Sequence, residues 1–381
     1  MATKKTDNDT TAAGQDGTPC EGQGGTSSRR RRVAAVRFSA LGDVAMTVPV
    51  LYDACASNPG VDFVMVTRKA FVGIFVNAPA NLTVMGVDLK GQYHGAHGMM
   101  KLATDIDADT LIDLHDVLRT KLLRLRMRLR GKRVVTFDKA RAAKRQLIRN
   151  GQFGAPAVSA TTDRYADAFR AAGLKLDGTF SGLYAAHPAD PALFAAVHSP
   201  KPTGARWVGV APFAAHAGKM YDSDSMRRVV DSLAELPGTH VFLFGGGGTE
   251  ADTMLGWAAG HADTVSVVAG SGIGFAGELA LMNQLDVMLT MDSGNMHLAA
   301  AAGTRTVSLW GATNPKAGFA PWQPQGQRRH CTMCAPYKCS PCSAYGNKPC
   351  ALADSPKCIN SLDPADIVRN VTLVAGGGEI L

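Results

Sequence analysis

The sequence predicts an α/β protein with two doubly wound parallel-sheet domains, and two observations support this prediction. Short apolar segments alternate with segments of helical spacing, and this alternation occurs twice, separated by a stretch punctuated with Pro and Gly. Such alternation is typical of βαβ units, which build parallel sheets. The length of 381 residues exceeds what one ordinary core needs and fits two domains.

The first series predicts one sheet and its helices. We expect strands at residues 33–38, 61–67, 82–87, 110–114 and 133–137. We expect helices at residues 44–57, 69–77, 98–106, 117–129 and 163–172. These elements form a first domain of residues 33–190. Residues 1–32, which are polar and end in arginines, predict a disordered tail because they offer almost nothing to bury.

The second series predicts another sheet of similar size. We expect strands at residues 207–211, 241–244, 265–268, 287–290 and 306–309. We expect helices at residues 224–235, 249–260, 274–283 and 295–302. The second domain spans residues 205–362, after a boundary near 182–205. A last helix within residues 363–381 is expected to pack back on the first domain.

The formal net charge of +8 is unevenly spread. Residues 119–149 hold thirteen Lys or Arg and one acid, Asp138. A solvated helix surface would explain this, but the one-sided sign favours a patch for an anionic partner. No apolar run is long enough to cross a bilayer, and the N-terminus lacks the apolar core of a signal peptide. We therefore expect a cytoplasmic protein.

In open parallel sheets, ligands bind beyond the carboxyl ends of the strands. Residues 39–43 occupy that position after the first strand. Gly42 would let the backbone approach a ligand closely. Asp43 has two interpretations: it caps the next helix, or it takes a proton from a hydroxyl group. Spacing alone favours the cap.

Three segments of the second domain occupy the same position. Lys219 would neutralise a phosphate, although a single loop lysine is more often solvated. Gly245 and Gly246 open a glycine run that leads into a helix, an arrangement that favours anions. Asp292 or Ser293 would cap the next helix, whose first backbone N–H groups would face an anion.

Six of the eight cysteines lie between Cys331 and Cys358. A large chain with an adequate core does not need a disulfide framework in the cytoplasm. Two C-x2-C pairs would suit zinc, but they lie four residues apart, whereas zinc ribbons separate them by ~15–20. Reduced thiols in an irregular loop are favoured, and structural zinc is the alternative.

Taken together, these segments resemble glycosyltransferase family nine, the heptosyltransferases. The resemblance rests on RFSALGD at 37–43 with Pro49, DLH at 113–115 with Arg119, DSGNMHLAAA at 292–301 and LWGATNP at 309–315. It spans about residues 33–375. It implies a GT-B architecture, in which two Rossmann-like domains face a central cleft. It also implies inverting transfer of heptose from ADP-heptose to the inner core of lipopolysaccharide. Helix N-termini after Gly248 and Asp292, together with Lys219, can stabilise the departing diphosphate without a metal.

The resemblance also assigns roles to residues. Asp43 matches the catalytic base, and Lys219 a lysine near the donor phosphates, although Met220 and Tyr221 replace the Trp-Pro pair expected after it. Asp292, Ser293, Gly294 and His297 match the donor-binding turn, and we add Gly42, Gly245 and Gly246 as donor-binding residues from their positions after the strands. The acceptor-binding residues are Arg119, Lys139, Arg141 and Lys144. No metal and no cofactor beyond the nucleotide sugar is implied. The partners are the donor, the lipid A and inner-core acceptor, and the anionic inner face of the inner membrane.

Three other functions remain as alternatives. A nucleic-acid-binding protein would interleave aromatic residues with its cations, and residues 119–149 offer only Phe137. An epimerase or oxidoreductase would need a nicotinamide site after the first strand, where Gly42 is the single glycine. A relative that uses another sugar or acceptor, or that only binds sugar nucleotides, would share the motifs. The two Asp-x-Asp sequences follow no apolar strand, which disfavours metal-dependent transfer.

Overall fold

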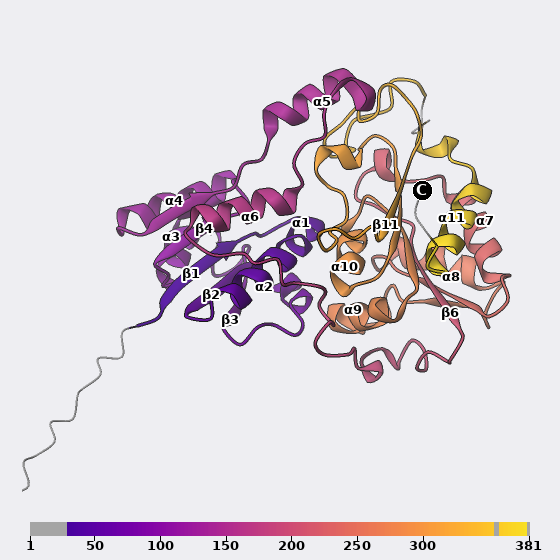
Figure 1. The fold of residues 1–381 in the computed structure, drawn as a ribbon, viewed down its shortest axis with the longest axis horizontal. Coiled ribbons are helices and arrows are strands. Elements are labelled where there is room, and N and C mark those ends of the chain that lie inside the picture. The colour runs from indigo at the N-terminus through magenta and orange to yellow at the C-terminus, as the bar shows by residue number, and fades with distance from the viewer. Residues whose placement is uncertain (1–28, 354–357, 379–381) are drawn as a thin grey trace, which may run out of the picture. The chain divides into compact units, whose positions relative to one another are not determined.

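A computed structural model describes residues 29–353 and 358–378. Two parallel sheets of five and six strands confirm the predicted fold class (Figure 1). Most of the predicted tail, residues 1–28, lies outside the described residues. Arg31 and Arg32, which we placed in that tail, instead begin the first strand.

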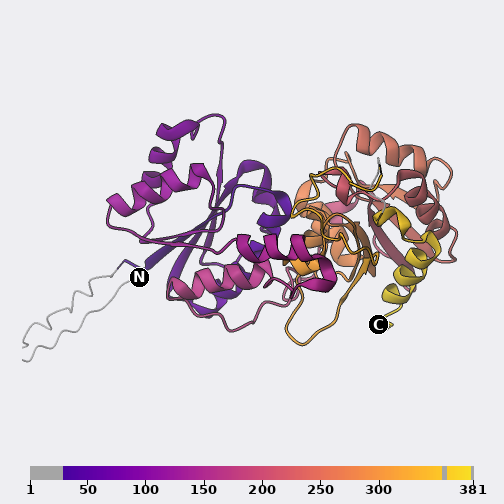
Figure 2. The same ribbon diagram turned by 90° about the horizontal axis from the view of Figure 1, so that it is seen from above.

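The first sheet has the order β3-β2-β1-β4-β5. Its strands are β1 (Arg31–Val36), β2 (Val61–Arg68), β3 (Leu82–Val87), β4 (Thr110–Asp113) and β5 (Arg133–Thr136). Its helices are α1 (Leu41–Ala45), α2 (Thr47–Ser57), α3 (Gly95–Asp105), α4 (Leu118–Leu129), α5 (Arg141–Gly154) and α6 (Thr161–Ala171), with a 3-10 helix η1 (Lys69–Ile74). We call these elements the first lobe. Helices lie on both sides of this sheet (Figure 2), which explains why β1 is apolar on both faces.

The second sheet has the order β11-β10-β9-β6-β7-β8. Its strands are β6 (Arg206–Ala211), β7 (Thr239–Leu243), β8 (Val265–Val267), β9 (Val287–Met291), β10 (Thr306–Trp310) and β11 (His330–Cys334). Its helices are α7 (Ser223–Ala234), α8 (Thr249–Ala258), α9 (Gly274–Gln284), α10 (Gly294–Ala302) and α11 (Pro364–Ala375). Short 3-10 helices are η2 (Pro191–Phe194), η3 (Ala217–Lys219), η4 (Pro315–Ala317) and η5 (Ile359–Ser361). We call the elements from β6 onward the second lobe.

Both sheets reverse their winding at one place. The chain runs outward from β1 through β2 to β3, and then returns to the other side of β1 with β4. The second sheet does the same around β6, with β7 on one side and β9 on the other. Ligands of doubly wound folds bind at such a reversal, beyond the carboxyl ends of the strands. The fold therefore directs attention to the turns after β1, β4, β6 and β9.

The prediction for the last helix was wrong. Helix α11 packs on α7 and on strands β9, β10 and β11, not on the first lobe (Figure 1, yellow). Its buried residues Ile367, Val371 and Val374 join the hydrophobic core of the second lobe. Its apolar stripe predicts that the helix is docked, but the stripe does not say on which sheet.

Two elements of the fold were not predicted from the sequence. Edge strand β11 is half-buried, and its sequence HCTMC lacks the apolar run that marked the other strands. Helix α5 lies in the charge-dense segment, which we considered only for its charge.

In the part of the chain that the structure describes, no helix has the length and apolarity needed to cross a membrane.

Candidate functional site

The turn after β1 and the turn after β9 meet each other. Helix α1 packs directly on α10. A Cβ atom on Gly42 would lie 2.9 Å from Cδ2 of His297, and a Cβ atom on Gly294 would lie 2.6 Å from Cδ2 of Leu41. Both positions need glycine because the two helices approach so closely. Two motifs that are far apart in the sequence therefore form one surface.

A cavity of about 450 Å³ opens at this contact. Both proposed catalytic residues and all the proposed donor-binding residues line it: Gly42, Asp43, Lys219, Gly245, Gly246, Asp292, Ser293, Gly294 and His297. They come from turns that follow β1, β6, β7 and β9. We call this space the motif cavity.

Asp43 is held by neighbours from its own lobe. Its carboxylate forms an ion pair with Arg37 and accepts a hydrogen bond from the Ala40 N–H (3.3 Å). Arg37 is itself fixed, because its guanidinium donates to the carbonyls of Ser39 and Leu114, both at 2.6 Å. The Asp43 side chain remains 25% exposed. Asp43 thus bonds back to the start of α1, as the cap interpretation expects, and also lines the cavity.

Lys219 and Asp292 form an ion pair in the part of the motif cavity that the second lobe contributes. Lys219 Nζ lies 2.9 Å from Asp292 Oδ2, and both side chains are largely buried. Ser293 is at the N-cap of α10 but makes no capping bond through its side chain, which instead lies 3.2 Å from the Thr290 hydroxyl. The first N–H groups of α10 are therefore left for an anion.

His297 contributes a neutral ring. Burial lowers its pKa to about 4, and the neighbouring carboxylates of Asp292 and Asp43 only partly oppose this effect. Within the described structure, its Nδ1 is buried and has no hydrogen-bond partner. A buried polar atom without a partner is costly. The His297 residue as a whole lines the motif cavity.

The glycine run is not an open anion site. Gly246 N–H donates to the carboxylate of Glu250 at 2.7 Å, so a negative group already occupies part of the loop. Glu250 also lines the motif cavity, and we predicted no role for it from the sequence. Its position four residues after Gly246, in the first turn of α8, was the available signal. Such a carboxylate is suited to accept hydrogen bonds from sugar hydroxyls.

The four proposed acceptor residues do not form one surface. Arg119 lines a cavity of about 560 Å³ at the carboxyl end of the first sheet, together with Arg68, Lys69, Lys90 and His115. Burial, followed by nearby cations, lowers the pKa of His115 to about 3, so its ring is neutral. We call this the basic cavity. Of the four acceptor candidates, only Arg119 borders it.

The other acceptor candidates have internal partners. Lys139 donates to the Asp116 carbonyl (2.7 Å), and Arg141 pairs with the Asp116 carboxylate (3.0 Å). Lys144 is buried, with Nζ 3.9 Å from the centroid of the Phe319 ring. The expectation that Lys144 belongs to an open cationic surface was therefore wrong. Acids just before this segment in the sequence offset part of its charge, since Asp113 and Asp116 also pair with Arg124.

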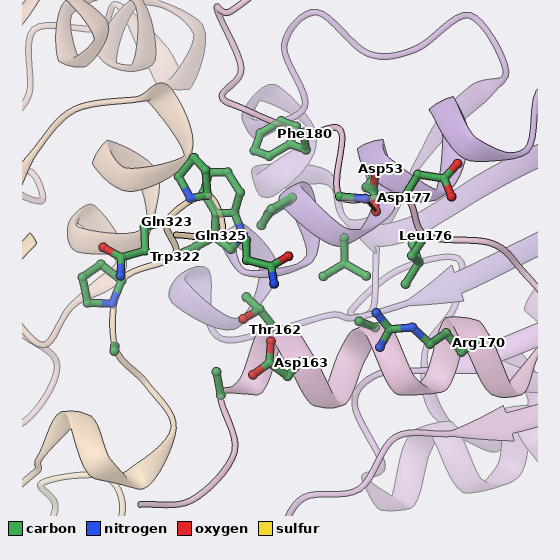
Figure 3. A pocket seen from close by; sticks show the side chains of 18 residues that line it. Asp53, Thr162, Asp163, Arg170, Leu176, Asp177, Phe180, Trp322, Gln323 and Gln325 are labelled. Carbon is green, nitrogen blue, oxygen red and sulfur yellow. Dashed lines mark hydrogen bonds between the residues drawn. The ribbon is translucent and has the colours of Figure 1, made fainter. Parts of the chain in front are cut away.

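A cavity of about 640 Å³ lies between α2, α6 and the loop at residues 320–325 (Figure 3). The rings of Phe180 and Trp322 pack together on one side of it, with their centroids 4.9 Å apart. Asp53 already accepts the backbone N–H groups of Gly178 and Thr179. None of the proposed site residues borders this cavity, so its size alone does not make it the functional site.

Comparisons with known proteins agree with the fold and the motifs. The model of glycosyltransferase family 9 (heptosyltransferase) matches residues 101–350. No curated protein matches the sequence. A family 9 glycosyltransferase from Veillonella parvula is similar in structure at 17% identity, with 92% of this chain and 98% of that chain covered and a TM-score of 0.67.

Two solved structures from E. coli are similar as well. The ADP-heptose lps heptosyltransferase II covers 91% of this chain and 99% of its own at 13% identity, with a TM-score of 0.63. The heptosyltransferase WaaC with ADP is similar over 82% of this chain and 96% of its own, at 19% sequence identity and with a TM-score of 0.57. At these identities the structural likeness shows the fold, which is the two-domain arrangement described above.

Proposed function

Because the chain belongs to glycosyltransferase family 9, the heptosyltransferases, we propose that it transfers heptose from ADP-heptose to an inner-core sugar of lipopolysaccharide. The observation that carries this proposal is the motif cavity, where Asp43 of the first lobe faces Lys219, Asp292 and His297 of the second lobe. The names of the E. coli relatives support ADP-heptose as the donor.

The second lobe is proposed to bind the donor. Lys219 and the uncapped N–H groups of α10 face the space where a diphosphate would lie. Asp292 holds Lys219 in place before the donor arrives. Glu250 is suited to the ribose hydroxyls, and the neutral ring of His297 lines the same cavity.

The chemistry proposed for this arrangement is inverting and needs no metal ion at the reacting atoms. The acceptor hydroxyl attacks the anomeric carbon from the face opposite the diphosphate, and Asp43 takes the hydroxyl proton. A C–O bond to the acceptor forms as the bond to the ADP oxygen breaks. Lys219 and the N-terminus of α10 stabilise the negative charge that develops on ADP.

The basic cavity is proposed to hold the anionic part of the acceptor. Four cations, Arg68, Lys69, Lys90 and Arg119, line it together with one carboxylate, Asp88, so the charge of the lining is net positive. Phe38 and Ser39 line this cavity, and the next residue, Ala40, lines the motif cavity. An acceptor with carboxylate or phosphate groups in the basic cavity would therefore extend its hydroxyl toward Asp43.

Helix α4 suits contact with an anionic membrane surface. Its exposed leucines Leu118, Leu125 and Leu129 are spaced seven and four residues apart, which places them on one face. Exposed cations such as Lys121 and Arg128 accompany them. Each cation near an anionic leaflet contributes ~1 kcal/mol. We propose a cytoplasmic enzyme that associates peripherally with the inner face of the inner membrane.

Steady-state kinetics with separately varied donor and acceptor tests the division between the cavities. Arg68→Ala combined with Arg119→Ala should raise the acceptor KM and leave the donor KM unchanged. Lys219→Ala should raise the donor KM and lower kcat. The control is Arg170→Ala, a side chain paired with Asp167 at the 640 Å³ cavity, which should change neither constant. An unchanged acceptor KM in the first variant would refute the assignment of the basic cavity.

A further inference from the structure

Four cysteines line one pocket in the second lobe. Cys339, Cys342, Cys350 and Cys358 surround a space of about 270 Å³ next to Gly218 and Ala312. They are separated in the sequence by two, seven and seven residues. Cys331, on edge strand β11, does not line this pocket. The structure thus brings one C-x2-C pair together with two later cysteines. The close spacing of the two C-x2-C pairs therefore no longer argues against a metal site.

We propose that these four thiols bind one thiophilic metal ion, Zn²⁺ or iron, in a tetrahedral site. Four sulfur ligands are typical of structural zinc and of iron centres, because soft thiolates prefer these metals. The site uses a C-x2-C pair and two cysteines from later in the same loop, which is a common way to supply four ligands.

A cation bound in this pocket would stabilise the four cysteines as thiolates, the form in which cysteine ligates these metals.

The ion must draw the thiols inward. In the described ranges, no three His, Cys, Asp or Glu side chains already stand as a set of metal ligands. The segment that carries the first three cysteines has room to adjust, because residues 335–353 form neither helix nor strand and Cys339 is exposed. The thiols of Cys339, Cys342 and Cys358 are not held in disulfides.

The site would hold a wall of the motif cavity. Ala344 and Tyr345, between the second and third ligands, line that cavity. Next to them, a Cβ atom on Gly346 would lie 2.6 Å from Cγ of Lys219. A Cβ atom on Gly218 would lie equally close, at 2.6 Å, to the Gly346 carbonyl oxygen. The metal would thus keep this loop pressed against Lys219. This positioning role rests on the proposed function, whereas metal binding does not.

Metal analysis of the full-length chain tests the site. The protein is purified under reducing, oxygen-free conditions, supplied with Zn²⁺ or Fe²⁺, desalted, and measured by inductively coupled plasma mass spectrometry. We expect about one ion per chain. Replacing the added metal with Co²⁺ should give the absorption bands of tetrahedral thiolate coordination. No bound ion with either metal would overturn the assignment.

Variants locate the site. Cys339→Ser and Cys350→Ser should each lower the retained metal about 10-fold or more. Cys331→Ser is the matched control, because its thiol lies on β11 and contacts Asn370, and it should retain the ion. Equal metal content in all three variants would overturn the assignment to this pocket.

Donor binding tests the positioning role separately. Calorimetry with ADP should show weaker binding for Cys350→Ser than for Cys331→Ser, while both keep a cooperative melting curve. If Cys350→Ser loses the ion but binds ADP normally, the metal site stands and its role at the motif cavity is refuted. Because metal content is measured without sugar transfer, failure of the metal assignment is distinct from failure of the proposed enzyme activity.

Discussion

Asp43 combines two interactions that the sequence presented as alternatives. Its carboxylate bonds the Ala40 N–H at the start of α1 and also reaches the motif cavity, while Arg37 fixes its direction. Spacing could predict a carboxylate near the end of β1. It could not predict the ion pair, because Arg37 also depends on the Leu114 carbonyl from a distant turn.

Substitution of Asp43 tests its role as the base. Asp43→Asn keeps the size of the side chain but cannot take the acceptor proton. Turnover should fall by ~10²–10⁴, with little change in ADP affinity, because general-base catalysis contributes about this much. Rapid-quench kinetics and calorimetry measure the two effects. Turnover close to that of the unmodified enzyme would contradict the assignment.

Gly42 offers a second test at the residue scale. In Gly42→Ala, the new methyl group would lie 2.9 Å from the buried His297 ring, which has little room to move. We expect the free energy of unfolding to fall by ~1–3 kcal/mol, as in other overpacked sites. The control is Gly256→Ala on the exposed face of α8, where a Cβ atom meets nothing within 4 Å. It should raise the free energy of unfolding by up to ~1 kcal/mol. Urea titrations measure both variants.

At the scale of elements, the sequence was most informative about strands with continuous apolar runs. Strands β6, β9 and β10 are buried at nearly every position and β1 at its last four, and such runs are easily recognised. Helix α5 was hidden because seven of its fourteen residues are charged or amide side chains, and only Lys144, Leu147, Gly151 and Gln152 are buried. Charge density was mistaken for exposure, although Lys144 is buried.

Lys144 gives α5 a pH-dependent cost. Burial, followed by Arg164, lowers the Lys144 pKa to about 7 from its ordinary 10.5. Between these values the unfolded chain binds the extra proton, so stability should rise as pH increases through this window. Lys144→Met removes the cost. Well below pH 7, this variant should raise the free energy of unfolding by roughly 1–3 kcal/mol, a range that allows for the Phe319 ring, which favours the charged amine. Near pH 10 the gain should be smaller.

The control for this prediction is Arg145→Met. Arg145 is the exposed neighbour on the same helix, and its replacement should shift the melting temperature little at either pH. Thermal melts across the pH range measure both variants. A stabilisation by Lys144→Met that does not depend on pH would show that the gain comes from packing and not from the buried charge.

At the scale of the whole molecule, Gln152 ties the two lobes together. Its side-chain amide donates to the carbonyls of Ala335 (3.1 Å) and Tyr337 (2.9 Å), and accepts a bond from Asn314 (3.1 Å). Its backbone carbonyl accepts from Lys316 Nζ at 2.7 Å. Gln152 is nearly fully buried. Such a set of long-range partners leaves no trace in local sequence spacing.

Removal of this side chain should weaken the whole fold. Gln152→Ala removes three long-range hydrogen bonds, to the carbonyls of Ala335 and Tyr337 and from the Asn314 amide, which should lower the free energy of unfolding by roughly 1–3 kcal/mol. Gln146→Ala, at an exposed position of α5, should change it by less than about 0.5 kcal/mol. Urea titrations followed by tryptophan fluorescence compare the two. Equal effects would mean that the Gln152 bonds contribute little net stability.

The sequence predicted both sheets and, through four separate turns, the residues that meet in the motif cavity. It misplaced α11 and treated the acceptor cations as one patch. Both errors concern which distant segments touch. An amphipathic stripe or a run of cations shows that a partner exists, but the partner's identity depends on strand order and helix packing.

The position of α11 also affects how the protein is made. Ile367, Val371 and Val374 fill the core between α7 and strands β9 to β11, so that core lacks a part until the ribosome has released this late segment. The first lobe is synthesised earlier, because its strands and helices through α6 are complete by Ala171. Domains generally fold as units and in order during synthesis. On a translating ribosome, the first sheet can therefore assemble while the second lobe still exposes the apolar groove that α11 will cover.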